Sequence, residues 1–250
     1  MDGNRRFAKK KSVKSSVGHY KGFDKLSETL KWCLDLGVPE VTVYAFSIEN
    51  FKRSEDEVTA LMDLARDKFK RLLDEVELMN DWGVRIHVAG RLSLLPNDLR
   101  SLVARAMLAT RYNNKLQLNI AYAYTGRDEI SRAASYIVDG CKNNDLTTDD
   151  IDEYLVSQAL DLAEAELLIR TSGEVRLSDF MLWQISRTVL YFSDVLWPEF
   201  TIWNLLAAII HFQRNAPPLL PENVNSDAKQ KFLNKLENKW WSDLESFVAC

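Results

Sequence analysis

Two short segments of the chain combine carboxylate, guanidinium and hydroxyl groups with glycine. The first, Met1-Asp-Gly-Asn-Arg-Arg6, places one carboxylate beside a Gly, an Asn and two Arg. The second, 170–180, holds two Arg, two Ser and a Gly within its first nine residues. An Asp binds a hard cation through oxygen, and Arg side chains and backbone N–H groups near Gly bind phosphate oxygens. Together the segments indicate a site for one or two diphosphates.

A third polar segment lies at the end of the apolar run 41–46. It contains Ser47, Asn50 and Arg53, and ligands of open parallel sheets bind beyond the carboxyl ends of strands. We therefore expect this segment to join the same site. Asn50 has an alternative interpretation, as a cap of the loop ahead of the next helix.

These segments must be positioned by strands and helices that alternate along the chain. Apolar runs of strand length are found at 41–46, 84–89, 116–121, 167–169 and 189–192. Ser54 and Glu57 form a capping box, which opens a long helix with apolar residues every three or four positions to residue 79. Pro96 begins another helix. This alternation predicts an α/β fold with a mostly parallel central sheet covered by helices on both faces.

Composition limits the class of protein. The chain has 250 residues, of which 46% are hydrophobic and 27% charged, and its net charge is −4. These values fit one large domain and give no reason to expect nucleic-acid binding. A local basic patch, 9–14, is interpreted either as a solvated loop or as a surface that attracts phosphate or membrane. Three Cys without paired spacing fit a reducing compartment.

The carboxyl-terminal part has a different organisation. Pro217, Pro218 and Pro221 interrupt the chain, and a helix is expected from about Ser226. We therefore divide the chain into a domain of residues 1–215 and a segment 216–250, which contains a linker and an amphipathic helix. The apolar stripe of that helix either docks on its own domain or contacts a partner or a membrane. The stripe contains Leu233, Leu236, Trp240, Leu244 and Phe247.

The motifs resemble those of the cis-prenyltransferases, the undecaprenyl diphosphate synthase family, and in particular its eukaryotic dehydrodolichyl diphosphate branch. The resemblance is carried by 1–10, His19, 44–53, 170–180 and Leu182-Trp-Gln184. It extends from residue 1 to about residue 213. It implies a parallel sheet flanked by helices, with an apolar tunnel for a prenyl chain.

The resemblance also implies an activity. Isopentenyl diphosphate units would be condensed onto farnesyl diphosphate, with Mg²⁺ as cofactor, to make long-chain polyprenyl diphosphate for dolichol synthesis and protein glycosylation. It implies a Nogo-B receptor-like accessory subunit and a peripheral location on the cytosolic face of the endoplasmic reticulum membrane. The alternatives are a non-catalytic accessory subunit and an inactive truncated fragment of the same family.

Roles for single residues follow from the same resemblance. Asp2 would hold Mg²⁺ and act in catalysis together with Asn50. Arg170, Arg176 and Ser178 match the residues that bind isopentenyl diphosphate, and Arg53 could serve either substrate. The complete set of expected substrate-binding residues is Gly3, Asn4, Arg5, Arg6, Phe7, His19, Phe46, Ser47, Phe51, Arg53, Arg170, Arg176 and Ser178.

The chain departs from the family pattern at several positions. Val189 stands where many bacterial relatives have a Glu that serves the metal, and Ser15 stands where many have an Arg. We expect the family's first strand, ahead of Asp2, to be missing, and we find no Arg-x-Gly segment near the carboxyl end. The acidic run 149–153 is interpreted as a helix start after Thr147 rather than a metal motif, because acidic residues are common in first turns.

Overall fold

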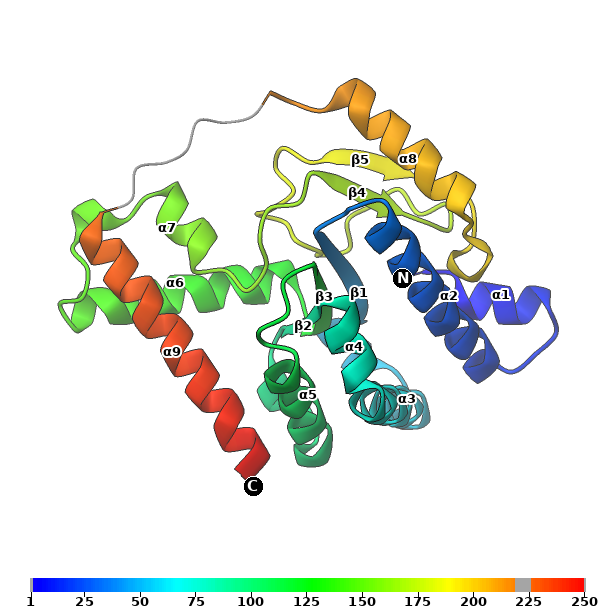
Figure 1. Ribbon diagram of the computed structural model, residues 1–250, viewed down its shortest axis with the longest axis horizontal. Helices are drawn as coiled ribbons and strands as arrows, with labels where there is room; N and C mark the ends of the chain where they lie inside the picture. The colour runs from blue at the N-terminus through cyan, green and yellow to red at the C-terminus, as the bar shows by residue number, and fades with distance from the viewer. Residues whose placement is uncertain (1, 219–225, 250) are drawn as a thin grey trace.

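The computed structural model describes residues 2–218 and 226–249 (Figure 1). Its strands are β1 (Glu40–Ser47), β2 (Val84–Ala89), β3 (Leu116–Tyr124), β4 (Leu167–Arg170) and β5 (Val189–Phe192). Its helices are α1 (Asn4–Lys10), α2 (Ser15–Asp35), α3 (Glu55–Asp74), α4 (Val76–Trp82), α5 (Asn97–Ala109), α6 (Gly126–Lys142), α7 (Glu153–Gln158), α8 (Ile202–Asn215) and α9 (Asp227–Ala249). All five predicted strands are therefore confirmed.

Every strand pair in the described part of the chain is parallel, as predicted. The strands form two sheets rather than the single sheet expected, one in the order β1-β3-β2 and one of β4 and β5. In the first sheet Ile120 lies opposite both Val43 and Val88. Side-chain packing joins the two sheets, because Tyr124 at the end of β3 packs in one buried cluster with Leu168 of β4.

Both faces of the three-stranded sheet are covered by helices. On one face, apolar residues of β1 and β2 pack against α3 and α5; they include Phe46, Ile86, Met62, Phe69, Val103 and Met107. On the other face, β1 and β3 pack against α2 and α8 through residues that include Val43, Leu118, Leu26, Cys33 and Leu205. Helices on both faces are typical of a parallel sheet, although β2 and β3 also carry the polar residues Arg85, His87, Gln117 and Asn119.

The predicted long helix from Ser54 is wrong in two respects. It is divided into α3 and α4, with the break at Glu75. The Ser54 side chain makes no capping bond, and Glu57 does not complete a capping box. The Glu57 carboxylate instead accepts a bond from Arg53 at 2.8 Å, because a guanidinium four residues earlier offers a charge-assisted bond, which is stronger than a bond from a neutral amide.

The acidic run 149–153 serves local structure, as the helix-start interpretation predicted. Asp150 accepts a bond from the Thr147 backbone N–H at 2.9 Å. Asp152 accepts one from the Leu155 N–H at 2.9 Å and one from the Lys229 ammonium at 2.5 Å. The last bond ties the start of α9 to the start of α7.

Helix α9 docks on its own domain, which confirms the first interpretation of its apolar stripe. Figure 1 shows α9 running from the α6–α7 region to α5. Near its start Leu233 and Leu236 pack with buried residues of α6 and α7, and near its end Leu244 is buried in the α3–α5 cluster. Within residues 2–218 and 226–249, no helix combines the length and the apolar character that a bilayer crossing requires.

Leu244→Ala should lower the free energy of unfolding by about 2–5 kcal/mol, because a side chain that is 1% exposed would leave a cavity. Val248→Ala, on the same helix at 39% exposure, is the matched control and should change it by less than about 0.5 kcal/mol. Denaturant unfolding of the full chain measures both. Equal effects would show that α9 is not docked as described.

Candidate diphosphate site

The two sequence clusters meet at the carboxyl end of β4. A guanidinium N–H of Arg170 donates to the Asp2 carboxylate at 2.8 Å, and a second donates to the Ser178 hydroxyl oxygen at 3.1 Å. The Arg170 side chain is 13% exposed and that of Asp2 is 49% exposed. A largely buried guanidinium thus faces a carboxylate that is accessible to a ligand, and the predicted proximity of the clusters is confirmed.

Close packing fixes the segment that carries Asp2. Gly3 adopts φ 94°, a left-handed conformation that favours glycine, and a Cβ there would lie 2.4 Å from the Ser172 Oγ. The Ser172 hydroxyl donates to the Asp2 backbone oxygen at 2.9 Å. Ser172 therefore holds the Asp2–Gly3 turn against the segment that follows β4.

Helix α1 lies equally close to α2. A Cβ on Gly18 would meet the Asn4 backbone oxygen at 2.2 Å, and one on Gly22 would meet the Asn4 Oδ1 at 2.3 Å. The two glycines stand four residues apart, so they lie on one face of α2. At the other end of α1, the Lys10 ammonium bonds Glu199 at 2.8 Å. These contacts hold Arg5 and Arg6 in place.

On one flank, Arg6 and Arg176 share a carboxylate. Arg6 lies 3.1 Å from the Glu174 carboxylate, and Arg176 also pairs with Glu174. The side chains of Arg6 and Arg176 are 48% and 63% exposed. Both guanidinium groups are therefore oriented by an acidic partner and still accessible to a phosphate.

On the other flank, Arg5 and Arg53 share Glu57, with N–O distances of 3.3 and 2.8 Å. His19 is nearby and half-buried. Burial, followed by the charge of Arg53, lowers the pKa of His19, so at neutral pH its imidazole is neutral and offers one N–H donor. Arg5 and Arg6 thus join two different groups of charges, although they are adjacent in sequence.

The turn after β1 positions the candidates that lie near the end of that strand. The Asn50 Oδ1 accepts a bond from the Ser47 N–H at 3.1 Å, so Asn50 caps a single 3₁₀ turn, 48–52, as its alternative interpretation suggested. Phe46 is 2% exposed and belongs to the core. Its ring supports that of Phe51, with ring centres 4.9 Å apart. Phe7, the last candidate, is half-buried in α1.

An apolar cavity of about 430 Å³ begins beside this turn. It lies between α3 and the segment that precedes α5. Its lining residues are Phe51, Val58, Thr59, Met62, Arg66, Leu94, Leu95 and Pro96.

The donor set fits Mg²⁺ only with help from a substrate. Among residues 2–218 and 226–249, no three His, Cys, Asp or Glu side chains form a metal-binding group. Mg²⁺ is often held by one or two carboxylates together with phosphate oxygens and water. Asp2 therefore suits an ion that bridges to a diphosphate.

The two departures have different surroundings. Val189 is buried at the amino end of β5 and lies opposite Leu167, three residues before Arg170. A side chain there would start about 10 Å along the strand from Arg170. Ser15 is exposed at the start of α2.

Sequence reasoning missed Ser172, Glu57 and Glu174. A signal was present for Glu57, since it stands four residues after Arg53 at the start of a predicted helix, a spacing that favours an ion pair. Glu174 stands between the two arginines of the second cluster. The bonds from Arg5 and Arg6 to these carboxylates have no sequence signal, because they depend on where α1 lies.

The comparisons with known proteins agree with this geometry. Residues 1–217 match the family described as "Putative undecaprenyl diphosphate synthase". The dehydrodolichyl diphosphate synthase complex subunit of Homo sapiens is 56% identical over 218 residues, which cover 86% of this chain and 66% of the human one. The chain thus spans slightly less than two thirds of that relative's length.

Two further proteins are matched over most of their own length. The tritrans,polycis-undecaprenyl-diphosphate synthase of Pyrococcus abyssi, which is geranylgeranyl-diphosphate specific, is 45% identical and covered over 82% of its length. The crystal structure of lavandulyl diphosphate synthase from Lavandula x intermedia, in complex with dimethylallyl diphosphate, superposes with a TM-score of 0.80 at 33% identity, over 85% of this chain and 92% of that one. With a family match over most of its length, the protein belongs to the undecaprenyl diphosphate synthase family of cis-prenyltransferases.

Proposed function

We propose that this chain is the catalytic subunit of a polyprenyl diphosphate synthase. It would condense isopentenyl diphosphate units onto farnesyl diphosphate to make a long-chain product for dolichol synthesis. The observation that carries the proposal is the Asp2–Arg170–Ser178 group with paired arginines on both flanks. A non-catalytic role would not require this concentration of phosphate-binding side chains around an accessible carboxylate.

The two flanks provide one place for each diphosphate. Arg5 and Arg53 pair with Glu57, whose neighbour Val58 lines the cavity. Together with His19 they would bind the diphosphate of farnesyl diphosphate, whose hydrocarbon would enter the cavity. Arg170, Arg176 and Ser178 would bind isopentenyl diphosphate, with Arg6 at the border. Two substrates held side by side in this way react as one bound pair, which removes much of the entropic cost of their meeting.

Charge is the main demand of the reaction, because the departing diphosphate gains negative charge as its bond to carbon breaks. Groups already oriented toward that charge lower the barrier most. Mg²⁺ bound at Asp2 would supply part of this stabilisation. Arg5 and Arg53 would supply hydrogen bonds from fixed positions, and the Ser47 N–H holds the amide of Asn50 in one orientation for a role at the proton that is lost.

A second subunit would complete the site. Asp2, Arg6 and Arg176 are each about half exposed or more, and charge interactions are weakened where water has access. The human relative is named as a complex subunit. We infer a partner of the Nogo-B receptor type, which would cover this side and place the enzyme at the cytosolic face of the endoplasmic reticulum membrane.

Asp2→Asn should reduce Mg²⁺-dependent incorporation of isopentenyl units by about 10²–10³-fold, because it removes the charge that holds the cation while an amide oxygen still accepts from Arg170. The measurement is the single-turnover rate, together with the thermal midpoint to establish folding. Asp24→Asn, at an exposed carboxylate paired with Lys21, is the control. A rate for Asp2→Asn within threefold of the parent would refute its role.

Arg176→Ala should raise the KM for isopentenyl diphosphate by about tenfold or more, and change the KM for farnesyl diphosphate much less. Arg53→Ala should show the opposite pattern. Arg176→Lys should not restore the parent KM, since a point charge cannot replace a bidentate guanidinium. Steady-state kinetics with each substrate varied in turn measure both values. Equal effects on the two substrates would contradict the division into two flanks.

The chain alone should make little or no long polymer, and a partner of the Nogo-B receptor type should raise the rate by at least about tenfold, since covering the open side strengthens every charge interaction there. Radiolabelled product formation by the purified chain, with and without the partner, gives the comparison. Adding an unrelated membrane protein controls for nonspecific effects. Robust synthesis by the lone chain would show that no partner is required.

A further inference from the structure

The segment that carries Ser178 has an unusual backbone. Ser178, Asp179 and Met181 have φ values of 52°, 60° and 48°. Residues other than glycine rarely adopt this left-handed backbone conformation, and surrounding contacts must hold them in it. Ser178 itself is exposed, and its hydroxyl oxygen accepts a bond from Arg170. The position of its hydroxyl therefore depends on its neighbours.

Asp179 provides three of these contacts, at the amino end of α6. Its Oδ1 accepts a bond from the Arg127 backbone N–H at 3.0 Å, and its Oδ2 accepts one from the Arg127 Nε at 2.8 Å. Its backbone oxygen accepts a third from the Gly126 N–H at 2.7 Å. Gly126 permits this approach, since a Cβ there would lie 3.0 Å from the Leu182 N.

Buried polar contacts fix the other end of the segment. The Glu129 carboxylate, 1% exposed, accepts bonds from the Gln184 amide at 2.8 Å, the Tyr124 hydroxyl at 2.5 Å and the Leu162 N–H at 3.0 Å. Met181 is also buried, at 2% exposure. The segment that follows Ser178 is therefore held at Asp179 by α6 and at Gln184 by Glu129, elements that lie outside the site.

We propose that Asp179 is a positioning residue for the diphosphate site: its bonds to the amino end of α6 hold the left-handed backbone that presents the Ser178 hydroxyl beside Arg170. The inference rests on the proposed function for the identity of the natural substrate. Its test does not depend on that function, because the test measures the binding of inorganic diphosphate and not the formation of polymer.

The two side-chain bonds of Asp179 are not equivalent. The Arg127 side chain is 76% exposed and that of Asp179 is 14% exposed, and ion pairs with such an exposed partner contribute little. The bond to the backbone N–H needs no charge on Asp179, and its donor is fixed in α6. Asp179→Asn, whose amide oxygen can still accept that bond, should therefore retain most of the function, and Asp179→Ala should lose it.

The first measurement is the Kd of inorganic diphosphate with Mg²⁺, by calorimetry on the full chain. Asp179→Ala and Ser178→Ala should each weaken binding by about tenfold. If Asp179 acts through Ser178, the double variant should bind no more weakly than Ser178→Ala alone. Additive losses in the double variant would overturn the proposal, and so would an unchanged Kd in Asp179→Ala. An unchanged Kd in Ser178→Ala would also overturn it.

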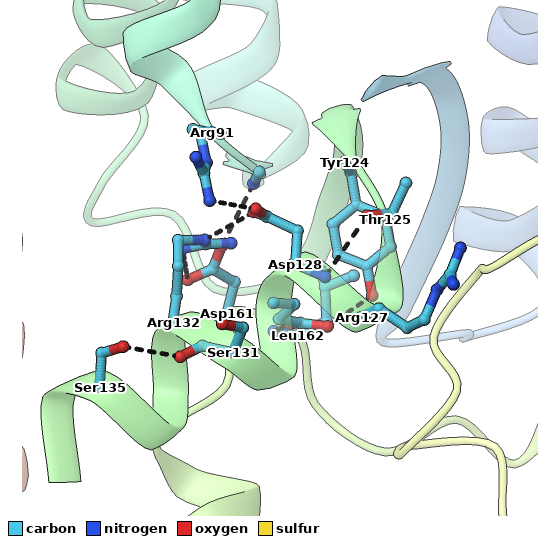
Figure 2. A network of polar contacts seen from close by, with 12 residues as sticks. Arg91, Tyr124, Thr125, Arg127, Asp128, Ser131, Arg132, Ser135, Asp161 and Leu162 are labelled. Carbon is cyan, nitrogen blue, oxygen red and sulfur yellow. Dashed lines mark hydrogen bonds and ion pairs between the residues drawn. The ribbon is translucent and has the colours of Figure 1, made fainter. Parts of the chain in front are cut away.

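Asp128→Asn is the matched control, because Asp128 follows in the same helical turn but faces away from the site. Figure 2 shows Asp128 between Arg91 and Arg132, whereas Arg127 extends to the opposite side. This variant should bind diphosphate as the parent does. A loss equal to that of Asp179→Ala would indicate a general effect of α6 and overturn the specific role.

A second variant keeps the test decisive if Asp179→Ala does not fold. Gly126→Ala keeps the Asp179 side chain but displaces the segment that carries it by a few tenths of an ångström. It should weaken diphosphate binding severalfold in the parent chain and cause no further loss in the Ser178→Ala variant. Parent-like binding by Gly126→Ala would then overturn the proposal. A failure of the proposed function can be distinguished from a failure of this inference. In that case the parent chain would make no polymer even with a partner present, while Asp179→Ala would still weaken diphosphate binding.

Discussion

The ion pair between Asp2 and Arg170 brings together residues that are 168 positions apart in sequence. Arg170 is at the end of a short strand, with a side chain that is 13% exposed, and a guanidinium cannot lose its charge in a protein. Such a charge is costly to bury unless partners compensate it. Asp2 and Ser178 are those partners, so the site can form only where the amino-terminal segment meets β4.

That requirement explains why α1 is packed so closely. A short helix with two adjacent arginines would present them in many directions if its position were loose. Gly18 and Gly22 let its backbone approach α2 within a distance that any side chain would prevent. The Trp197 indole bonds the Gly22 oxygen at 2.6 Å, so α2 is itself anchored. Because successive residues of a helix point about 100° apart, Arg5 and Arg6 then face different flanks.

Sequence reasoning was most successful where a pattern reflects burial. Apolar residues gather in the strands, so 84–89 and 189–192 were predicted to the residue. It was least successful where a local rule competes with a tertiary contact. Ser54 and Glu57 have the spacing of a capping box, but Arg53 and Arg5 take the carboxylate. The break at Glu75, the division into two sheets and the role of Asp179 likewise depend on packing between distant segments.

The shared carboxylates Glu57 and Glu174 solve an electrostatic problem that the site creates. Two guanidinium groups about 5 Å apart, at an effective dielectric constant of about 20, repel each other by about 3 kcal/mol. Five arginines near Asp2 repel one another unless carboxylates compensate their charge. A glutamate between two arginines removes most of the repulsion within each flank and fixes the direction of both side chains. A diphosphate has several anionic oxygens and can bond both arginines of a flank at once, whereas the carboxylate of each glutamate has only two oxygens. The same pairing that stabilises the cluster therefore favours a ligand with more charge than a carboxylate.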